Sequence, residues 1–406
     1  MALAGTNLEH ARSYNRRVVV ETVRLHGPLS RAEIARATGL SAQTVSNIAE
    51  ELLESGLLAA AGRRTGGRGQ PPVELALNPG GGFTIGLSLD HRRLVAVLVD
   101  LAGGRRAEVE VATAAPTPAE ALPLMADAVG RLRRRARVEA GRILGAGVVM
   151  PVLFEAGSPV SFGPTSLPAW DGFPLTERLS ALLGMPVLVE NDATAAAVGE
   201  RLYGAGRDLR DFLYVYFGVG LGSGLIVGGQ PHRGAGGRAG EIGHMMAVPD
   251  GRPCLCGRRG CLERYVSLAA AHAALAGPDA DAADIDPAGL EAAFLAGNPG
   301  LDAWLTEAAG HFRAALASIE NLLDPETVIL GGLLPPAMRR AFLDRLAPLA
   351  PSVADRPGRA RPRIVEAGLG PETPALGAAA LPLSHRLAPS LRSGEGAAEG
   401  ASAFDF

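Results

Sequence analysis

The three cysteines of this 406-residue chain lie within eight residues of one another, at Cys254, Cys256 and Cys261, and His244 precedes them. Three thiolates and one imidazole are the Cys₃His ligand set of a closed, tetrahedral structural zinc site. The alternatives are free thiols or a local disulfide, but a bond between Cys254 and Cys256 would close a small, strained ring. An odd, clustered cysteine count also favours a reducing compartment. We therefore predict a structural Zn²⁺ site that constrains this loop.

Composition limits the classes of protein to which the chain can belong. Hydrophobic residues make up 47% and charged residues 20%, which is sufficient for the large cores of two or three domains. The formal net charge of −3 excludes a protein that coats nucleic acid by bulk charge, so any DNA contact has to be local. The N-terminus lacks the apolar segment of a secretory signal, and no apolar run reaches the ~18 residues of a membrane span. We expect a cytoplasmic protein that does not enter a membrane.

The first part of the chain has the pattern of a winged helix-turn-helix. Apolar residues at helical spacing predict a helix over 14–26. Ser30 and Glu33 are spaced as a capping box that begins a second, short helix, and Ser41 is placed to cap a third. A short helix, a glycine-containing turn and a capped helix predict a DNA-binding domain over residues 10–78.

Two sets of residues in this domain are candidates for contact with operator DNA. The third helix leaves small and amide side chains outside its apolar stripe, where they suit base edges in a major groove: Ser41, Gln43, Thr44, Ser46 and Asn47. A hairpin follows, and its glycine-rich tip carries arginines that can enter a minor groove: Arg63, Arg64 and Arg68. Any three-helix unit can serve as an interaction module, and charged hairpin tips are usually just solvated. The order of the elements nevertheless favours DNA binding.

Residues 80–383 alternate between strand and helix patterns, which is typical of an α/β architecture. Strands are predicted at 83–89, 94–101, 106–113, 143–150, 187–190, 212–217, 225–227 and 327–330. Helices are predicted at 117–140, 193–203, 301–323 and 335–346. Two similar cycles indicate two lobes with a cleft between them. We expect a flexible join at the glycines of 80–82 and a mobile tail over 384–406, which is rich in Ser, Gly, Glu and Ala.

Carboxylates flank the predicted metal loop. Glu241 lies three residues before His244, and Glu263 lies two residues after the last cysteine. If zinc holds both ends of the loop, these side chains converge, and together they suit the vicinal hydroxyls of a sugar. Asn191 and Asp192 lie where a strand gives way to a helix, the place where α/β folds bind ligands. Helix capping is the competing explanation for Asn191 and Asp192, and solvated surface is the competing explanation for the glutamates.

A glycine-rich segment between two predicted strands is a candidate for phosphate binding. Gly218, Gly220 and Gly222 alternate with other residues in it, and their backbone N–H groups could surround a phosphate. A glycine hairpin is equally compatible with the pattern, because a lone glycine motif is weak evidence.

Together these motifs resemble the ROK family of sugar-responsive repressors and sugar kinases, and in particular its regulators of xylose and N-acetylglucosamine genes. The resemblance extends from the winged helix to about residue 383, and Glu241 to Glu263 is its most specific segment. It implies a two-lobed, actin-like (ribonuclease-H-like) fold and a homodimer or homotetramer. It also implies that His244 both ligates zinc and contacts the sugar. The loop 167–170 resembles the segment that closes over the sugar.

One departure from the family pattern concerns phosphoryl transfer. Family kinases carry Asp-x-Gly-Gly-Thr in the first strand-turn-strand, where the Asp supports Mg²⁺ and the Gly and Thr residues hold phosphate. Aligned on Gly86, this chain has Ser88 in the place of Asp, Asp90 and His91 in the places of the glycines, and Arg92 in the place of Thr. Phosphoryl transfer depends on positioning the phosphates and neutralising their charge. Loss of the phosphate-holding residues and loss of the carboxylate that supports Mg²⁺ therefore both count against a kinase.

The sequence thus predicts a non-catalytic, sugar-responsive transcriptional regulator derived from a kinase, most simply a repressor. Gly218, Gly220 and Gly222 would be a vestigial phosphate loop. The alternative is an ATP-dependent hexose kinase in which Asp192 is the base. A third interpretation retains DNA binding but makes a protein, rather than a sugar, the inducer.

Overall fold

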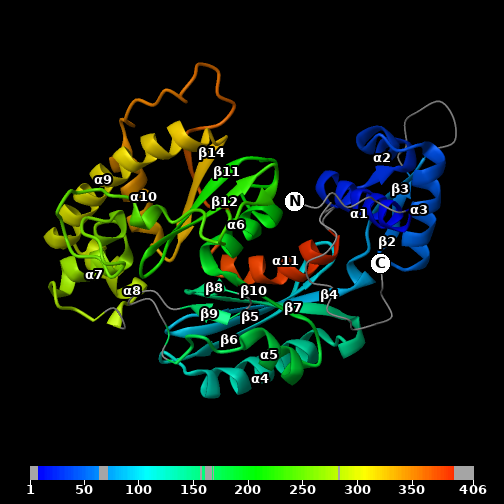
Figure 1. Ribbon diagram of the computed structural model, residues 1–406, viewed down its shortest axis with the longest axis horizontal. Helices are drawn as coiled ribbons and strands as arrows, with labels where there is room; N and C mark the ends of the chain where they lie inside the picture. Colours follow the sequence, from blue (N-terminus) through cyan, green and yellow to red (C-terminus); the bar gives the residue numbers. More distant parts are fainter. Residues whose placement is uncertain are drawn as a thin grey trace.

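The structure is a computed structural model that describes residues 8–63, 72–155, 158–160, 167, 169–281 and 284–387. An N-terminal winged-helix head lies beside a body of two α/β lobes, as Figure 1 shows. The predicted order of domains is therefore reproduced. Two predicted features lie outside the described residues: the tip of the wing with Arg64 and Arg68, and the tail beyond residue 387.

The head contains α1 (Leu8–His26), α2 (Arg31–Thr38) and α3 (Ala42–Glu54) on a sheet of strand order β1 (Leu29–Ser30), β3 (Val73–Leu77) and β2 (Leu58–Arg63). The predicted capping box is present, because the backbone N of Glu33 donates to Ser30 Oγ at 3.3 Å and the backbone N of Ser30 donates to Glu33 Oε2 at 2.9 Å. Ser41 caps α3 by accepting from the backbone N of Thr44 at 3.1 Å. Local polar chemistry thus defines both helix starts.

The N-terminal lobe is a five-stranded sheet with helices on both faces. Its strand order is β10 (Val187–Asn191), β7 (Ile143–Met150), β4 (Phe83–Leu89), β5 (Arg93–Asp100) and β6 (Arg105–Ala112). Two helices cover one face, α4 (Pro118–Ala136) and α5 (Leu175–Leu183), while α11 (Thr373–Leu387) covers the other (Figure 1). A small antiparallel pair, β8 (Leu153–Glu155) and β9 (Ser158–Val160), lies at its edge.

The C-terminal lobe is a second five-stranded sheet. Its strand order is β13 (Gln230–Pro231), β12 (Leu221–Val227), β11 (Phe212–Phe217), β14 (Thr327–Gly332) and β15 (Ile364–Glu366). One face packs on α6 (Asp192–Tyr203). The other packs on a group of helices, α7 (Leu268–Ala276), α8 (Pro287–Leu295), α9 (Pro299–Leu323) and α10 (Pro336–Leu346). The predicted two lobes are confirmed.

Helices α6 and α11 join the lobes, since α6 packs on the second sheet, α11 packs on the first, and the two helices pack closely on each other. Glycine makes this approach possible. A Cβ atom on Gly377 of α11 would lie 1.7 Å from the carbonyl oxygen of Ala195 in α6. On the strand side, a Cβ on Gly86 would lie 1.8 Å from the carbonyl oxygen of Ala375. A larger residue at either position would force the elements apart.

The head packs firmly on the body, which corrects the prediction of a flexible join at residues 80–82. Pro79–Gly81 form a 3-10 turn whose start is capped by Asn78, and Gly81 is buried against the carbonyl of Gly56. Leu101, Leu144 and Leu383 of the body belong to the same hydrophobic cluster as the core of the head. The last of these side chains lies on α11, so this helix contacts the first sheet, α6 and the head.

Other boundaries also differ from prediction. Helix α11 was not predicted and continues to Leu387, so residues 384–387 are helical rather than part of a tail. Strand β12 begins at Leu221, four residues before the predicted start, and α4 ends at Ala136. Helices α5, α7 and α8 were also missed. The alanine- and leucine-rich sequences of α7 and α8 carry little amphipathic periodicity, and α5 is only nine residues long.

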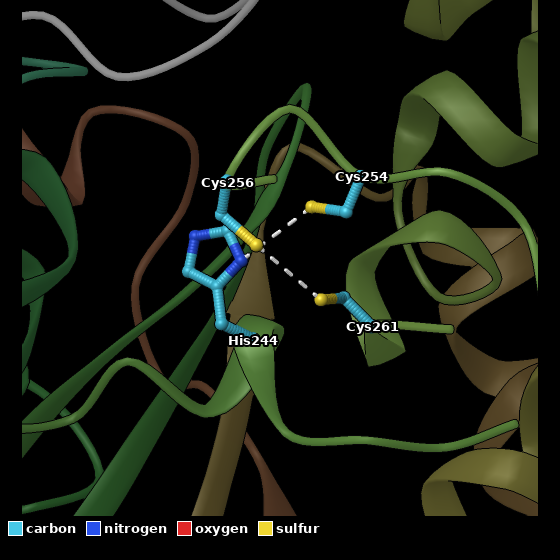
Figure 2. A group of neighbouring side chains, drawn as sticks. All are labelled: His244, Cys254, Cys256 and Cys261. Atoms are coloured by element: carbon cyan, nitrogen blue, oxygen red, sulfur yellow. Dashed lines mark hydrogen bonds between the residues drawn. The ribbon is translucent and has the colours of Figure 1, made fainter. Parts of the chain in front are cut away.

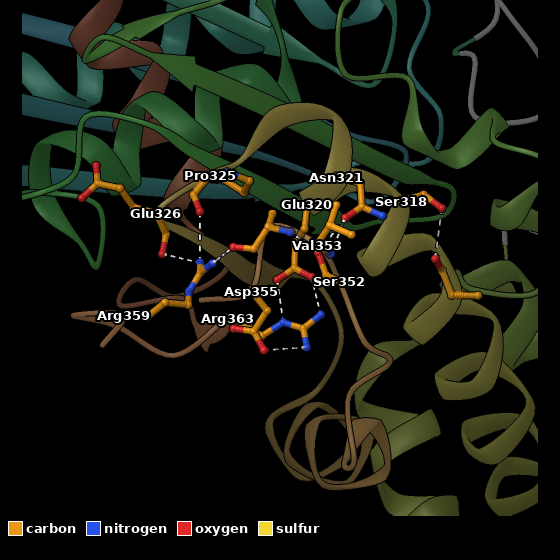
Figure 3. A network of polar contacts seen from close by, with 12 residues as sticks. Ser318, Glu320, Asn321, Pro325, Glu326, Ser352, Val353, Asp355, Arg359 and Arg363 are labelled. Atoms are coloured by element: carbon orange, nitrogen blue, oxygen red, sulfur yellow. Dashed lines mark hydrogen bonds and ion pairs between the residues drawn. The ribbon is translucent and has the colours of Figure 1, made fainter. Parts of the chain in front are cut away.

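A polar network fastens the segment that leads into β15 (Figure 3). Glu320 of α9 has no exposed side-chain surface and accepts from Arg363 Nε at 2.8 Å, with a second contact from Arg363 Nη2. Arg359 donates to the backbone carbonyls of Pro325 and Glu326 at 3.0 and 2.9 Å. These contacts hold a proline-rich connection against the end of the long helix.

Candidate functional site

The cysteines and His244 form one compact cluster (Figure 2). Their ligand atoms all lie within 4.8 Å of one another. Cys254 Sγ lies 3.7 Å from His244 Nδ1, and Cys256 Sγ lies 3.6 Å from Cys261 Sγ. Ligands at 2.0–2.3 Å around a tetrahedral zinc ion are separated by roughly these distances. The donor set and its spacing therefore fit a metal ion.

Tight turns bring these ligands together. His244 ends a 3-10 turn (Ile242–His244), and Cys261 precedes another (Leu262–Arg264). The segment between them folds back on itself with Gly260 at a φ of 74°, where a Cβ would lie 1.6 Å from the carbonyl oxygen of Val248. Only glycine satisfies both requirements at this position.

The predicted convergence of carboxylates on His244 is confirmed. Glu263 Oε1 lies 3.5 Å from His244 Nδ1, and Glu241 Oε2 lies 4.0 Å from His244 Nε2. Desolvation raises the pKa of Glu241, His244 opposes this rise, and the charge of Glu263 adds to it. The imidazole thus turns Nδ1 toward the thiols and Nε2 toward Glu241. One nitrogen of the ring can therefore bind a metal ion while the other contacts a second ligand.

Asn191 acts as the N-cap of α6. Its Oδ1 accepts from the backbone N of Ala193 at 3.0 Å and of Thr194 at 3.4 Å, while its Nδ2 donates to the Val152 carbonyl at 3.3 Å. The capping explanation is therefore correct for this residue. Contact between Asn191 and a sugar stays a prediction.

Asp192 begins α6 and is electrostatically unusual. Burial raises the pKa of its carboxyl to about 7, and the negative charges of Asp90 and Glu241 add to the rise. A hydrogen bond from the backbone N of Ala193, at 2.8 Å, acts in the opposite direction. The Asp192 carboxyl is therefore influenced by charges from both lobes, Asp90 in the first and Glu241 in the second.

The glycine-rich segment is only partly a loop. Gly218 and Gly220 form the turn between β11 and β12, where the backbone N of Gly218 donates to the carbonyl of Gly220 at 3.0 Å. Gly222 lies within β12, and a Cβ there would come within 2.9 Å of the Ala193 side chain. The prediction that Gly222 belongs to a phosphate loop is wrong in its placement, because this residue makes room for α6. Phosphate contact by Gly218 and Gly220 stays a prediction.

The predicted DNA-contact residues lie mostly on the outer face of α3. Ser41, Gln43 and Asn47 are exposed, while Thr44 and Ser46 are half-buried. Gln43 Nε2 donates to Asn47 Oδ1 at 2.9 Å, so the two amides form a pair. Arg63 ends β2, and Arg64 and Arg68 lie outside the described residues. Base contact by any of them stays a prediction.

Two contacts within the body were not found from the sequence. Arg233, which follows β13, binds Glu190 through Nε at 2.8 Å and Nη2 at 2.6 Å. No local spacing signals this pair, because its members are 43 residues apart. Trp170, in the predicted closing segment, is fully buried in the first lobe and donates from Nε1 to the Pro116 carbonyl at 2.8 Å. That part of the segment is thus anchored in the core.

Among the described helices, none combines the length and the apolar character needed to cross a membrane.

Comparison with known proteins places the body and the head in two families. Residues 84–385 match the ROK family, and residues 18–69 match the MarR family. The chain is 28% identical to the putative xylose repressor of Caldicellulosiruptor sp. over 78% of this chain and 82% of that protein. It is 35% identical to the glucokinase of Streptomyces coelicolor over 62% of this chain and 82% of the kinase.

Solved structures agree with this assignment. A crystal structure of a ROK family transcriptional regulator, a homologue of the E. coli MLC protein, superposes with a TM-score of 0.70 at 22% identity, covering 93% of this chain and 97% of the other. A ROK family glucokinase from Streptomyces griseus, in complex with glucose and AMPPNP, superposes with a TM-score of 0.58 at 31% identity, covering 74% of this chain and 99% of the other. The first covers head and body, whereas the second covers a share of the chain close to that of the body alone. The chain carries a MarR-type winged helix on a ROK body and belongs to the ROK family.

Proposed function

We propose that this protein is a sugar-responsive transcriptional repressor that binds operator DNA through α3 and the wing. The single observation that carries the proposal is the union, in one chain, of an exposed recognition helix with a carboxylate and imidazole cluster suited to sugar hydroxyls. Repressors named for xylose are among the relatives, which supports the same function. It acts in the cytoplasm, where bacterial DNA is found.

The sugar site would be formed by Asn191 and Asp192 from the first lobe and by Glu241, His244 and Glu263 around the metal loop. Carboxylates accept hydrogen bonds from vicinal hydroxyls, and His244 Nε2 is turned toward the same space. Zinc bound by His244 and the three cysteines would hold this loop in place and would neutralise the thiolates.

A homodimer would connect the sugar to DNA. Two heads bind two half-sites, and their spacing has to match successive major grooves. A sugar that favours one arrangement of the lobes about 100-fold shifts the equilibrium by about 2.7 kcal/mol, which is sufficient to release the operator. The contact of α11 with the head at Leu383 provides a direct route for such a change.

Fluorescence anisotropy with a fragment of the protein's own promoter region tests this proposal. The expected result is sequence-selective binding that weakens when one member of a panel of gluco-, manno- and xylo-configured sugars, with and without N-acetyl groups, is added. Absence of selective binding to that fragment would refute the proposal. Selective binding that no sugar alters would leave a regulator whose inducer is a protein.

The second candidate is a sugar kinase, favoured by the identity to glucokinase and by the raised pKa of Asp192, which suits a general base. Against it stands Ser88 in the place of the magnesium-supporting carboxylate, with Asp90, His91 and Arg92 replacing the phosphate-binding residues. A coupled assay of ADP release across hexoses, with Asp192→Asn as control, distinguishes the two. Turnover that the substitution abolishes would establish the kinase.

A further inference from the structure

The turn between β4 and β5 borders the proposed sugar site. In the sheet, Ser88 of β4 and Glu190 of β10 both align with Val149 of the strand between them. The turn that follows Ser88 and the start of α6 therefore lie at the same edge of the sheet. Consistent with this placement, the charge of Asp90 contributes to the raised pKa of Asp192.

The turn is held rigidly from both sides. Asp90 Oδ1 accepts from the backbone N of Arg92 at 2.7 Å and of Arg93 at 2.9 Å. On the other side, the backbone N of Thr113 donates to the Arg92 carbonyl at 2.7 Å. Both strands of the hairpin and the end of β6 thus fix the base of the Arg92 side chain.

From this fixed position, the Arg92 side chain reaches the C-terminal lobe. Its Nη1 donates to the backbone carbonyl of Ile285 at 2.9 Å, although the two residues are 193 positions apart. Ile285 is 3% exposed and belongs to the main hydrophobic cluster of the C-terminal lobe, immediately before α8. The bond therefore joins two firmly held points, one in each lobe. The threonine found at this place in family kinases is too short to extend so far.

We propose that Arg92 is an interlobe strut, which has replaced a phosphate-binding residue and stabilises the arrangement in which the two halves of the sugar site face each other. This proposal rests on the proposed function for its ligand but not for its geometry. In this arrangement Arg92 bonds to the Ile285 carbonyl and Arg233 of the C-terminal lobe bonds to Glu190, beside Asn191, so the two halves of the proposed site are held toward each other. A protein whose competent state is less populated binds its ligand more weakly in proportion.

Hydrogen–deuterium exchange of the sugar-free protein tests the strut directly. In Arg92→Ala, amides of the turn at 90–93 and of α8 are expected to exchange about tenfold faster, since a hydrogen bond to a charged group is lost. Arg92→Lys, which keeps a charged donor, should restore part of the protection. Arg131→Ala is the matched control, because Arg131 pairs with Asp127 at 3.7 Å within the same helix, α4.

Sugar titration completes the test. Arg92→Ala is expected to weaken binding of the responsive sugar about tenfold at unchanged zinc content, although Arg92 lies outside the residues proposed to touch the sugar. Unchanged exchange at both sites in Arg92→Ala would overturn the strut, whatever the sugar results. Faster exchange in a protein that responds to no sugar would uphold the strut and refute the proposed function, so the two failures are separable.

Discussion

Arg233 holds Glu190 with two nitrogens, Nε at 2.8 Å and Nη2 at 2.6 Å, and thereby ties the C-terminal lobe to the residue that precedes Asn191. Glu190 is 13% exposed, and its other oxygen accepts from the backbone N of Asn191 at 3.1 Å. The ion pair thus positions the strand end from which the proposed sugar site begins.

Removal of this tie is expected to weaken sugar binding. Arg233→Ala leaves the Glu190 carboxylate without its partner, and a pair of this exposure contributes about 1 kcal/mol, or about fivefold in affinity. Isothermal titration with the responsive sugar measures the change. Arg356→Ala is the control, because it breaks an exposed pair with Asp324 far from the site and should leave the affinity intact.

Asp192 is expected to make stability depend on pH. Its pKa is about 7 in the folded chain and near 4 when unfolded. Between these two pH values the folded protein therefore keeps a proton on this carboxyl that the unfolded chain has lost. Stability therefore falls as pH rises from about 4 to about 7, by at most about 4 kcal/mol. Asp192→Asn should remove this component. Parallel denaturation midpoints for both proteins from about pH 5 to pH 8 would contradict it.

Loss of one metal ligand is expected to separate sugar response from DNA binding. Cys256→Ser removes one of the four donors, so zinc content should fall and the loop from Glu241 to Glu263 should loosen. The hydrophobic cluster of the head includes residues of the body but, among the described residues, none of this loop, so operator affinity without sugar should change much less than the response to sugar. Metal analysis and anisotropy measure the two effects. Full zinc content in this variant would refute the assigned ligand set.

The recognition helix is expected to determine sequence preference. Asn47→Ala removes an exposed amide and its pair with Gln43, and loss of a base contact costs about 1–3 kcal/mol at one position of the operator. Anisotropy with single-base operator variants identifies that position. Glu54→Gln, at the far end of α3, is the control and should alter no base preference. An unchanged preference in Asn47→Ala would exclude this residue from base contact.

The buried pair at the end of α9 is expected to be important for stability. Glu320→Ala leaves Arg363 without its main partner in a largely enclosed position, a change that typically costs about 3–5 kcal/mol. Denaturant titration measures the loss, and the exposed pair of Asp324 and Arg356 again supplies the control. A loss below about 1 kcal/mol would show that solvent reaches Arg363 after the substitution.

Local chemistry made several parts of the molecule predictable. The capping box at Ser30 and Glu33, the cap at Ser41 and the clustered ligands from His244 to Cys261 depend on residues close in sequence, so spacing alone identifies them. Alternation of strand and helix patterns likewise indicated two lobes, because each pattern reports which face of an element is buried.

Contacts between distant segments were decided only by the tertiary structure. Two such contacts arise because the two sheets face each other across α6 and α11: Arg92 with Ile285, and Glu190 with Arg233. No periodicity in the chain records that arrangement. The same is true of Gly222, which the sequence places in a loop and the packing of α6 places in a strand. The sequence by itself determined the local caps, the clustering of His244 with the three cysteines and the order of the domains, since these follow from short-range chemistry. The tertiary structure alone decided which carboxylates lie beside His244 and which arginine reaches from one lobe to the other, since such contacts arise only when the chain packs.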